Sequence, residues 1–419
     1  MVTVSSLGAA TALIVAIVLI LKKVSPAYGM IVGALIGGLA GGVNLTDTIN
    51  LMIGGAQGIT TAVMRILAAG VLAGVLIESG AANTIAETII KKLGEKRALL
   101  ALILATMILT SVGVFVDVSV ITVSPIALAL AKRVNLSKTS ILLAMVGGGK
   151  AGNIMSPNPN AIAASDAFNI PLTSIMAAGV IPAIFGVIIT YLLAKKLINK
   201  GSKVNDNEIT NITNQLPNFI PAITAPLCAI LLLTLRPIFN IVIDPMIALP
   251  LGGIIGAICM KKAKQTNQYA VTGLTKMMPV AIMLLGTGAL AGIISNSGLK
   301  NVLIDGLTTS GLPSYLLAPI SGILMSLATA STTAGTVVAS NVFSSTLIEL
   351  GITSIAGAAM IHAGATVLDH MPHGSFFHAT GGSINMDIKE RLKVIPYETT
   401  IGLIMTIIST LIFGVFKYF

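Results

Sequence analysis

The sequence is poor in charged residues, cysteine and aromatic residues. Only 10% of its 419 residues are charged and 55% are hydrophobic, whereas soluble domains carry roughly 25% charged residues. This shortage excludes an ordinary soluble domain. Tryptophan is absent and aromatic residues make up 4% of the chain, so an aromatic belt at a membrane interface is thin. The two cysteines, Cys228 and Cys259, form no motif and say nothing about the redox compartment.

Features of enzymes and of nucleic-acid-binding proteins are also missing. There is no nucleophile elbow, no HExxH motif and no polar segment long enough for a cytoplasmic catalytic domain. We therefore expect neither an enzyme nor a bound cofactor. The net charge of +10 comes from short basic clusters between apolar runs, a pattern that basic cytoplasmic loops explain better than binding to nucleic acid.

Apolar runs of about 20 residues recur along the whole chain, which is typical of proteins that cross a membrane many times. The first run has no basic region before it, so we expect a retained span and not a cleaved signal peptide. An amphipathic segment at 46–58 is predicted to lie along the membrane interface. The predicted continuous spans are 7–21, 28–43, 60–77, 174–193, 219–235, 247–260, 279–294 and 394–416.

Two further apolar segments predict re-entrant hairpins, because each of their arms is shorter than a full span. The first covers 98–131, with its tip at 111–117. The second covers 315–347, with its tip at 329–335. We expect both tips to stop inside the membrane.

Residues 147–160 read GGGKAGNIMSPNPN and cannot form a continuous helix. Pro157 and Pro159 remove backbone donors, and the glycines weaken a helix further. Irregular backbone at membrane depth is tolerated only where protein or a water-filled cavity surrounds it. The sequence therefore predicts a broken helix at 140–164 that lines a polar cavity, and a second broken helix at 354–381.

An internal repeat relates the two halves of the chain. A shift of 218 residues aligns Gly55 with Gly273, and a shift of 219 aligns Pro26 with Pro245. The predicted units are a first repeat at 1–200, a cytoplasmic linker at 201–215 and a second repeat at 216–419.

The charge distribution predicts the orientation of these repeats. With the N-terminus outside and both hairpins re-entrant, most of the 25 lysine and arginine residues face the cytoplasm. Each half then has five spans, one of them broken, plus one hairpin, so the repeats are inverted. The predicted fold class is an all-α polytopic membrane protein with two inverted repeats, an architecture common among transporters.

Uncharged polar side chains at the tips and breaks are candidates for binding a small polar anion. Exposed amides at helix N-termini, together with hydroxyl groups, are suited to a carboxylate. Lys150 would offset the charge of that anion. The candidate substrate-binding residues are Ser111, Lys150, Asn153, Ser156, Asn158, Asn160, Ser331, Thr332 and Thr333.

Ionisable groups at membrane depth are costly and therefore suggest function. Asp117, Asp369 and His370 are candidates for ion coupling, because a carboxylate beside a histidine can exchange a proton near neutral pH. As alternatives, Asp117 could pair with Lys150, or these groups could form a structural network. A zinc site built from His370 and two further histidines, His373 and His378, is disfavoured because no predicted geometry sets three ligands.

Residues 148–160, GGKAGNIMSPNPN, followed by AIAA, resemble the signature of gluconate permease (GntP-type) transporters. The segment from Asp369 to Lys393 lies where that family has its second polar broken helix. The resemblance covers most of the chain. It implies proton-coupled uptake of gluconate or related small hydroxy acids across a bacterial inner membrane. It also implies an elevator-like shift of a transport domain and a homodimer.

One departure keeps the substrate open. The PPHPGP-type motif that well-known gluconate carriers have early in the chain is absent, so 3-hydroxybutyrate, glycerate, lactate and citrate are also candidate substrates. The activity could also be that of a Na⁺-coupled carboxylate carrier, a cation/proton antiporter, a channel or a membrane-embedded enzyme. Inverted repeats with broken helices favour a carrier with alternating access.

Overall fold

The computed structural model describes residues 3–208, 216–299, 302, 305, 309, 311–372 and 374–417. Within these ranges the protein is helical, with two isolated bridges (Val4–Ser297 and Ser137–Lys203) and no strand. The predicted all-α class is confirmed. Residues 209–215 of the expected linker lie outside the described part, and its described portion contains a short 3-10 helix, Asp206–Glu208.

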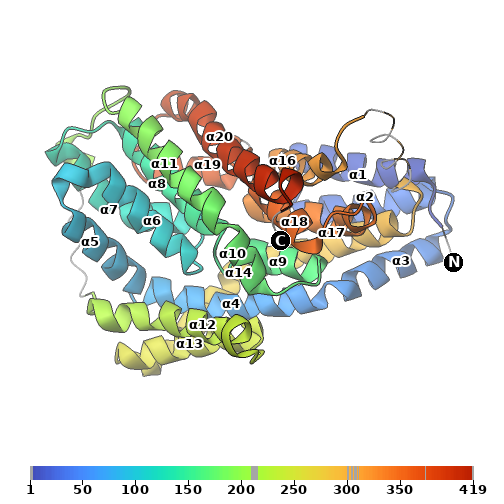
Figure 1. Cartoon of the computed structure of the whole chain (residues 1–419), viewed down its shortest axis with the longest axis horizontal. Helices are drawn as coiled ribbons and strands as arrows, with labels where there is room; N and C mark the ends of the chain where they lie inside the picture. Colours follow the sequence, from blue (N-terminus) through green and yellow to red (C-terminus); the bar gives the residue numbers. More distant parts are fainter. Residues whose placement is uncertain are drawn as a thin grey trace.

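One set of helices, here called the flanking group, packs along one side of the molecule. In Figure 1, α4, α12 and α13 lie together along the lower edge, and α14 runs behind them. These helices are apolar over most of their length, and many of their side chains remain exposed because the surrounding solvent is lipid. The flanking group consists of α1 (Ser6–Leu21), α2 (Pro26–Ala40), α3 (Leu45–Gly58), α4 (Thr60–Glu78), α12 (Phe219–Phe239), α13 (Pro245–Cys259) and α14 (Thr266–Ser295).

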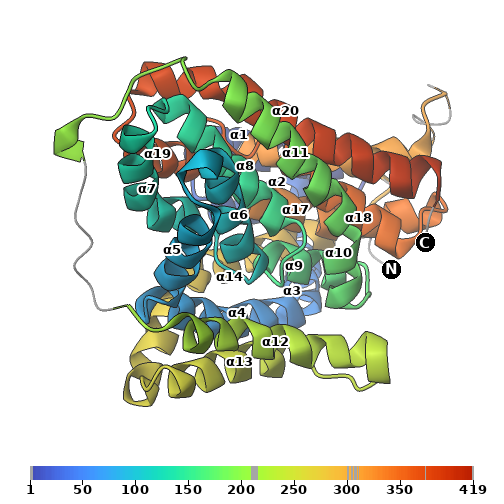
Figure 2. The same cartoon turned by 60° about the vertical axis from the view of Figure 1, so that its left-hand side comes forward.

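A second set, the hairpin group, contains the two predicted hairpins and the two predicted broken helices. Figure 2 shows much of this group between α4, α12 and α13 on one side and the long helices α11 and α20 on the other, with α1 and α2 behind. The hairpin group consists of α6 (Ala98–Ser111), α7 (Val116–Arg133), α8 (Lys138–Asn153), α9 (Pro159–Ala167), α16 (Leu317–Thr329), α17 (Thr332–Glu349), α18 (Ser354–Gly364) and α19 (Ser375–Gly382).

The remaining helices connect or cover these two groups. α5 (Ala81–Leu93) contacts α6 and α12, and α10 (Leu172–Ala178) contacts α9 and α18. α11 (Val180–Lys196) packs against α8 and α20 (Ile388–Thr410), and a short π-helical segment, Leu411–Val415, extends α20.

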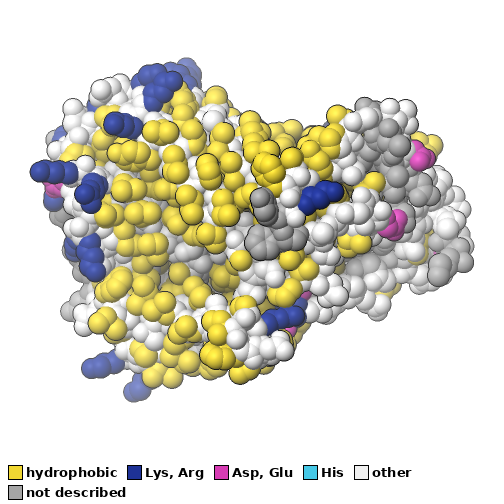
Figure 3. All heavy atoms as spheres, viewed as in Figure 1, with side chains coloured by type: hydrophobic (Ala, Val, Ile, Leu, Met, Phe, Trp, Pro, Cys, Tyr) yellow, Lys and Arg dark blue, Asp and Glu magenta, His cyan; other side chains and the backbone are white. Residues whose placement is uncertain are grey.

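Many of these helices are long and apolar enough to cross a membrane, as the sequence predicts. Among the described residues, five stretches meet both criteria: Thr60–Glu78, Leu172–Lys196, Phe219–Phe239, Ala263–Ser295 and Ile388–Val415. Several shorter apolar helices, among them Ser6–Leu21 and Pro26–Ala40, accompany them. Figure 3 shows one face dominated by hydrophobic side chains, with lysine and arginine gathered mainly toward one end.

Both predicted hairpins are present as two antiparallel helices joined by a short turn. Between α6 and α7 the turn passes through Gly113, whose φ of +102° is easily reached only by glycine. Between α16 and α17, Ser331 caps α17 by accepting a hydrogen bond from the amide of Ala334 at 3.2 Å. Each turn therefore directs the N-terminus of the following helix toward the interior.

Both predicted breaks are also present. α8 ends at Asn153 and α9 begins at Pro159, with Asn158 as its N-cap. Pro159 occupies the first helical position, where its missing N–H costs nothing. α18 ends at Gly364, and the next helix among the described residues begins at Ser375.

The amphipathic segment predicted at 46–58 forms the helix α3, which packs lengthwise on α14. The span predicted at 279–294 is part of a longer helix, because α14 already begins at Thr266. The close approach is possible because glycines meet in the contact. A Cβ atom on Gly55 of α3 would overlap the carbonyl oxygen of Gly288 on α14.

Candidate functional site

A cavity of about 750 Å³ lies where the two hairpin tips and the two breaks meet α14. The N-terminal turns of α7 and α17 line it through Phe115–Val118 and Ser331–Ala334. Those of α9 and α19 line it through Asn160, Ser375 and Phe376. Helix N-termini carry unpaired amides and partial positive charge, so this convergence favours a negatively charged ligand.

Seven of the residues named from the sequence line this cavity. They come from both halves of the chain and from both kinds of irregular element. Asp117, Ser331, Thr332 and Thr333 lie at the hairpin tips, and the breaks contribute Asn153, Asn160 and Asp369. The Oδ1 atom of Asn160 is buried and has no hydrogen-bond partner among the described residues. Unpaired polar atoms of this kind are costly in a finished core but suit a site that receives a ligand or water.

Directly behind the cavity, Asp369 belongs to a buried charged network. Lys150 donates hydrogen bonds to Asp369 Oδ1 at 2.6 Å and to the carbonyl oxygen of Thr366 at 2.7 Å, and its Nζ lies 2.9 Å from His370 Nδ1. On the cavity side, Thr332 donates to Asp369 Oδ2 at 2.5 Å. Asp369 therefore connects the hairpin tip at α17 to the buried lysine on α8.

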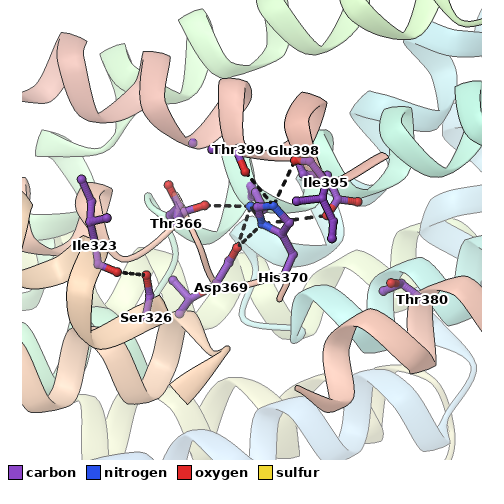
Figure 4. A network of polar contacts seen from close by, with 12 residues as sticks. Ile323, Ser326, Thr366, Asp369, His370, Thr380, Ile395, Glu398 and Thr399 are labelled. Carbon is purple, nitrogen blue, oxygen red and sulfur yellow. Dashed lines mark hydrogen bonds and ion pairs between the residues drawn. The ribbon is translucent and has the colours of Figure 1, made fainter. Parts of the chain in front are cut away.

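His370 extends the network away from the cavity (Figure 4). Its Nδ1 lies 3.0 Å from Asp369 Oδ1, and its Nε2 lies 3.0 Å from Thr399 Oγ1 and 3.2 Å from the carbonyl oxygen of Ile395. Glu398 Oε2 is 3.9 Å from Nδ1. The imidazole is fully buried and does not line the cavity.

A second buried ion pair lies beyond His370, and sequence reasoning missed it. Arg391 and Glu398 approach to 2.8 Å, both at 1% exposure or less, and the guanidinium carbon of Arg391 lies 4.7 Å from the ring centre of Phe377. Two opposite charges seven residues apart lie on the same face of a helix. Glu398 lies within the predicted last span and Arg391 lies three residues before it, so their spacing of seven was a signal that could have identified the pair.

Several named residues lie away from the cavity lining. Lys150 is 1% exposed and reaches the cavity only through Asp369. Ser111 donates within its own helix to the carbonyl oxygen of Ile108. Asn158 caps α9 and donates to Asn153, and the hydroxyl of Ser156 is buried with no hydrogen-bond partner in the described part of the chain.

Two hypotheses raised from the sequence can now be compared with the structure. Lys150 pairs with Asp369, so the suggested pairing with Asp117 is wrong. The Asp117 carboxylate instead accepts a hydrogen bond from the amide of Val118 at 2.9 Å. For the disfavoured zinc site, His373 lies outside the described residues, and within them no three histidine, cysteine or acidic side chains gather to hold a metal.

Lys276 was also placed differently by sequence reasoning. The expected span began at 279, which left this lysine in a cytoplasmic segment. In the structure it lies within α14 and lines the cavity, as do Phe115 and Phe376. A lysine three residues before a proline inside a helix gives no signal that sequence alone could read.

Comparison with known proteins identifies the family. The family model described as GntP family permease matches residues 4–416. An uncharacterized transporter from Haemophilus influenzae is 77% identical over 419 residues and covers all of both chains. The high-affinity gluconate transporter of Escherichia coli is 21% identical over 425 residues, covering 93% of this chain and 95% of that protein.

A solved structure supports the fold. The crystal structure of the Alcanivorax borkumensis YdaH transporter matches with a TM-score of 0.69 and 16% identity, over 89% of each chain. At this identity the match concerns the fold alone. The family model spans nearly the whole chain, and the apolar helices make this a multi-pass inner-membrane protein. The chain therefore belongs to the GntP family of permeases.

Proposed function

We propose that this permease is a secondary active transporter that carries a small organic anion together with a proton. The observation that carries the proposal is the cavity, where four helix N-termini converge directly in front of a buried charged network. Gluconate or a shorter hydroxy acid such as 3-hydroxybutyrate, glycerate, lactate or citrate suits its mixture of amides, hydroxyls and asparagine side chains. The names of relatives such as the gluconate transporter of Escherichia coli support this substrate class.

The substrate carboxylate binds between the two hairpin tips in this proposal. The first turns of α7 and α17 present backbone amides, and Ser331, Thr332 and Thr333 add hydroxyl groups. Asn153 and Asn160 provide neutral donors and acceptors for the hydroxyl groups of the substrate. Lys150 acts indirectly, because its ammonium group holds Asp369 in place.

In this proposal His370 is the proton carrier, because Asp369 and Glu398 already form ion pairs with Lys150 and Arg391. With His370 neutral, the buried charges of Lys150, Asp369, Arg391 and Glu398 sum to zero. One proton on His370 gives this network a charge of +1, which offsets a bound monocarboxylate. Asp369, which lines the cavity and lies 3.0 Å from Nδ1, provides the route for that proton.

We also propose the finer architecture expected from the sequence, two inverted repeats that move like an elevator. Its support is the correspondence of the elements. α2 (Pro26–Ala40) and α13 (Pro245–Cys259) have equal length at a shift of 219 residues. α7 and α17 correspond equally well at a shift of 216.

The contacts of α14 with α3 and with α4 add support for the inverted repeats. Gly70 and Gly74 approach Gly273, and their counterparts Gly288 and Gly292 approach Gly55. Such reciprocal contacts are the mark of a two-fold relation. In this proposal the hairpin group is the moving domain, the flanking group stays fixed, and the protein functions as a homodimer.

Uptake of radiolabelled D-gluconate and of the shorter acids into proteoliposomes tests the function. An imposed inward proton gradient should drive accumulation of at least one of them, and a Na⁺ gradient alone should not. Accumulation that needs Na⁺ and ignores pH would instead establish a Na⁺-coupled carrier, and single-channel currents in planar bilayers would contradict a carrier.

The proton carrier is tested by comparing accumulation with exchange. His370→Gln should abolish accumulation driven by a proton gradient, while exchange of internal for external substrate continues. Asp117→Asn is the matched comparison, because Asp117 lines the same cavity but lies outside the charged network. If Asp117→Asn uncouples transport and His370→Gln does not, the proton carrier is Asp117.

A further inference from the structure

Among the described residues that line the cavity, one cationic side chain is available to bind a ligand. Lys150, the lysine expected to face the anion, is 1% exposed, and its three contacts are all protein groups. Among the described residues that line the cavity, Lys276 carries the only lysine or arginine side chain. A bound anion therefore meets the ammonium group of Lys276.

Lys276 is free to make this contact. Its residue is exposed, and its ammonium group has no hydrogen bond or ion pair with any described part of the chain. Asp117 on α7 lines the same cavity and forms no ion pair with Lys276. The two groups face the same cavity from different elements, so they give it a positive and a negative side.

The position of Lys276 differs from that of the polar residues contributed by the tips and breaks. Asp117, Asn153, Thr332 and Asp369 all belong to the hairpin group or its connections. Lys276 lies on α14, which packs against α2, α3 and α4 in the flanking group and contacts α17 across the boundary. A ligand held by the hairpin tips is therefore within reach of Lys276 only while the cavity lies against α14.

We propose that Lys276 forms an ion pair with a carboxylate of the transported molecule in this state, and that this contact selects organic anions over neutral polyols. The inference rests on the proposed function and names the charged residue that function requires. A lysine ammonium is a compact charge on a flexible stem. It can follow carboxylates on substrates of different length, so Lys276 selects for charge and tolerates differences in chain length.

Substitutions at Lys276 test this role in proteoliposomes that take up radiolabelled D-gluconate, or whichever probe acid the wild type accumulates. Lys276→Gln should raise KM about tenfold or more, the loss expected for one charge-assisted hydrogen bond, with the maximal rate within about twofold of wild type. Lys276→Arg should keep KM within about threefold. Lys276→Glu should abolish measurable uptake.

Lys264→Gln is the matched control, because Lys264 is exposed in the 3-10 turn Ala263–Gln265 just before α14 and does not line the cavity. Competition gives a second readout. Unlabelled sorbitol should not inhibit uptake of the labelled acid by the wild type. In Lys276→Gln, inhibition by sorbitol should become stronger relative to inhibition by unlabelled gluconate.

The outcomes separate this inference from the proposed function. If the wild type accumulates an acid and Lys276→Gln keeps the wild-type KM, the role of Lys276 is refuted and the proposed function stands. If the wild type accumulates none of the organic acids tested, both are refuted. A KM that rises equally in Lys276→Arg and Lys276→Gln would also overturn the charge contact, since arginine retains the charge.

Discussion

Lys150 places its ammonium group 2.6 Å from Asp369 and 2.7 Å from the carbonyl oxygen of Thr366, with 1% of its side chain exposed. Breaking a buried ion pair by removing one partner costs about 3–5 kcal/mol, because the second charge stays buried without compensation. Replacing both partners by neutral groups of similar volume is often tolerated.

Lys150→Ala should therefore abolish transport and lower the thermal stability of the detergent-solubilised protein. The double variant Lys150→Met with Asp369→Asn should recover most of that stability but no transport, because it removes both charges and keeps their volumes. Thermal unfolding followed by fluorescence-detected size exclusion, together with uptake assays, measures both properties. A double variant less stable than Lys150→Ala would show that removing both charges does not avoid the cost of an uncompensated buried charge.

At the scale of elements, the lengthwise contact of α3 and α4 with α14 depends on glycines that allow backbones to approach. Small residues at such contacts are typical of membrane helices, where van der Waals packing replaces the hydrophobic effect between helices. The neighbouring glycines Gly54 and Gly55 have very different surroundings. Gly55 faces Gly288 and Gly292, whereas nothing lies within 4 Å of a Cβ placed on Gly54.

Gly55→Ala should destabilise the protein by about 1–3 kcal/mol, because the added methyl group forces α3 away from α14. Gly54→Ala is the matched control and should be neutral or stabilising by up to about 1 kcal/mol, since alanine favours a helix over glycine. Comparing the melting temperatures of the two purified variants tests this prediction. Equal melting temperatures would mean that the contact tolerates a methyl group.

At the scale of the whole molecule, Arg65 joins distant segments. Its Nε lies 3.1 Å from both carboxylate oxygens of Asp244, in the turn before α13, and its guanidinium also pairs with Asp166 on α9. One side chain thus connects the flanking group to the hairpin group. The two carboxylates lie 101 and 179 residues from Arg65 in the chain, so no local sequence pattern identifies this contact.

This connection predicts a pH dependence. Burial raises the pKa of the Asp244 carboxyl, but the hydrogen bond and charge of Arg65 lower it further, so its pKa lies below the usual range. A depressed carboxyl pKa stabilises the fold above the unfolded value of about 3.9, and this stabilisation is lost as pH falls through the folded value. The side chains of Arg65, Asp166 and Asp244 are partly exposed, at 25%, 16% and 33% respectively.

Asp244→Asn should therefore lower stability by about 1 kcal/mol or less at pH 7, since solvent screens the pair. The difference from wild type should shrink as the pH falls below the ordinary range of carboxyl groups. Thermal unfolding in detergent between pH 7 and pH 3 tests this. A difference that stays constant across that range would mean that the ionised carboxylate is not the stabilising group.

The orientation of the whole chain gives another prediction. With the N-terminus outside, Thr46 in the first turn of α3 faces out and Lys264 faces the cytoplasm. After replacement of Cys228 and Cys259, a cysteine at 46 should react with an impermeant maleimide in intact cells, and a cysteine at 264 should react only in opened membranes. The reverse pattern would invert the predicted topology.

Local chemistry in the sequence determined much of the fold. Pro157 and Pro159 lack backbone donors, so a break between α8 and α9 could be predicted from sequence. Hydropathy located both hairpins and most spans. The residues at the breaks and tips could be named for the same reason, since irregular backbone at membrane depth must line protein or water.

Only the tertiary structure decided which of those residues meet. Lys150 could pair with Asp117 or with Asp369, and packing alone selected the partner 219 residues away. The same packing moved Lys276 into the cavity wall and buried Arg391 against Glu398. Backbone preferences act over a few neighbouring residues, whereas pairing of side chains more than 200 residues apart depends on how whole helices pack.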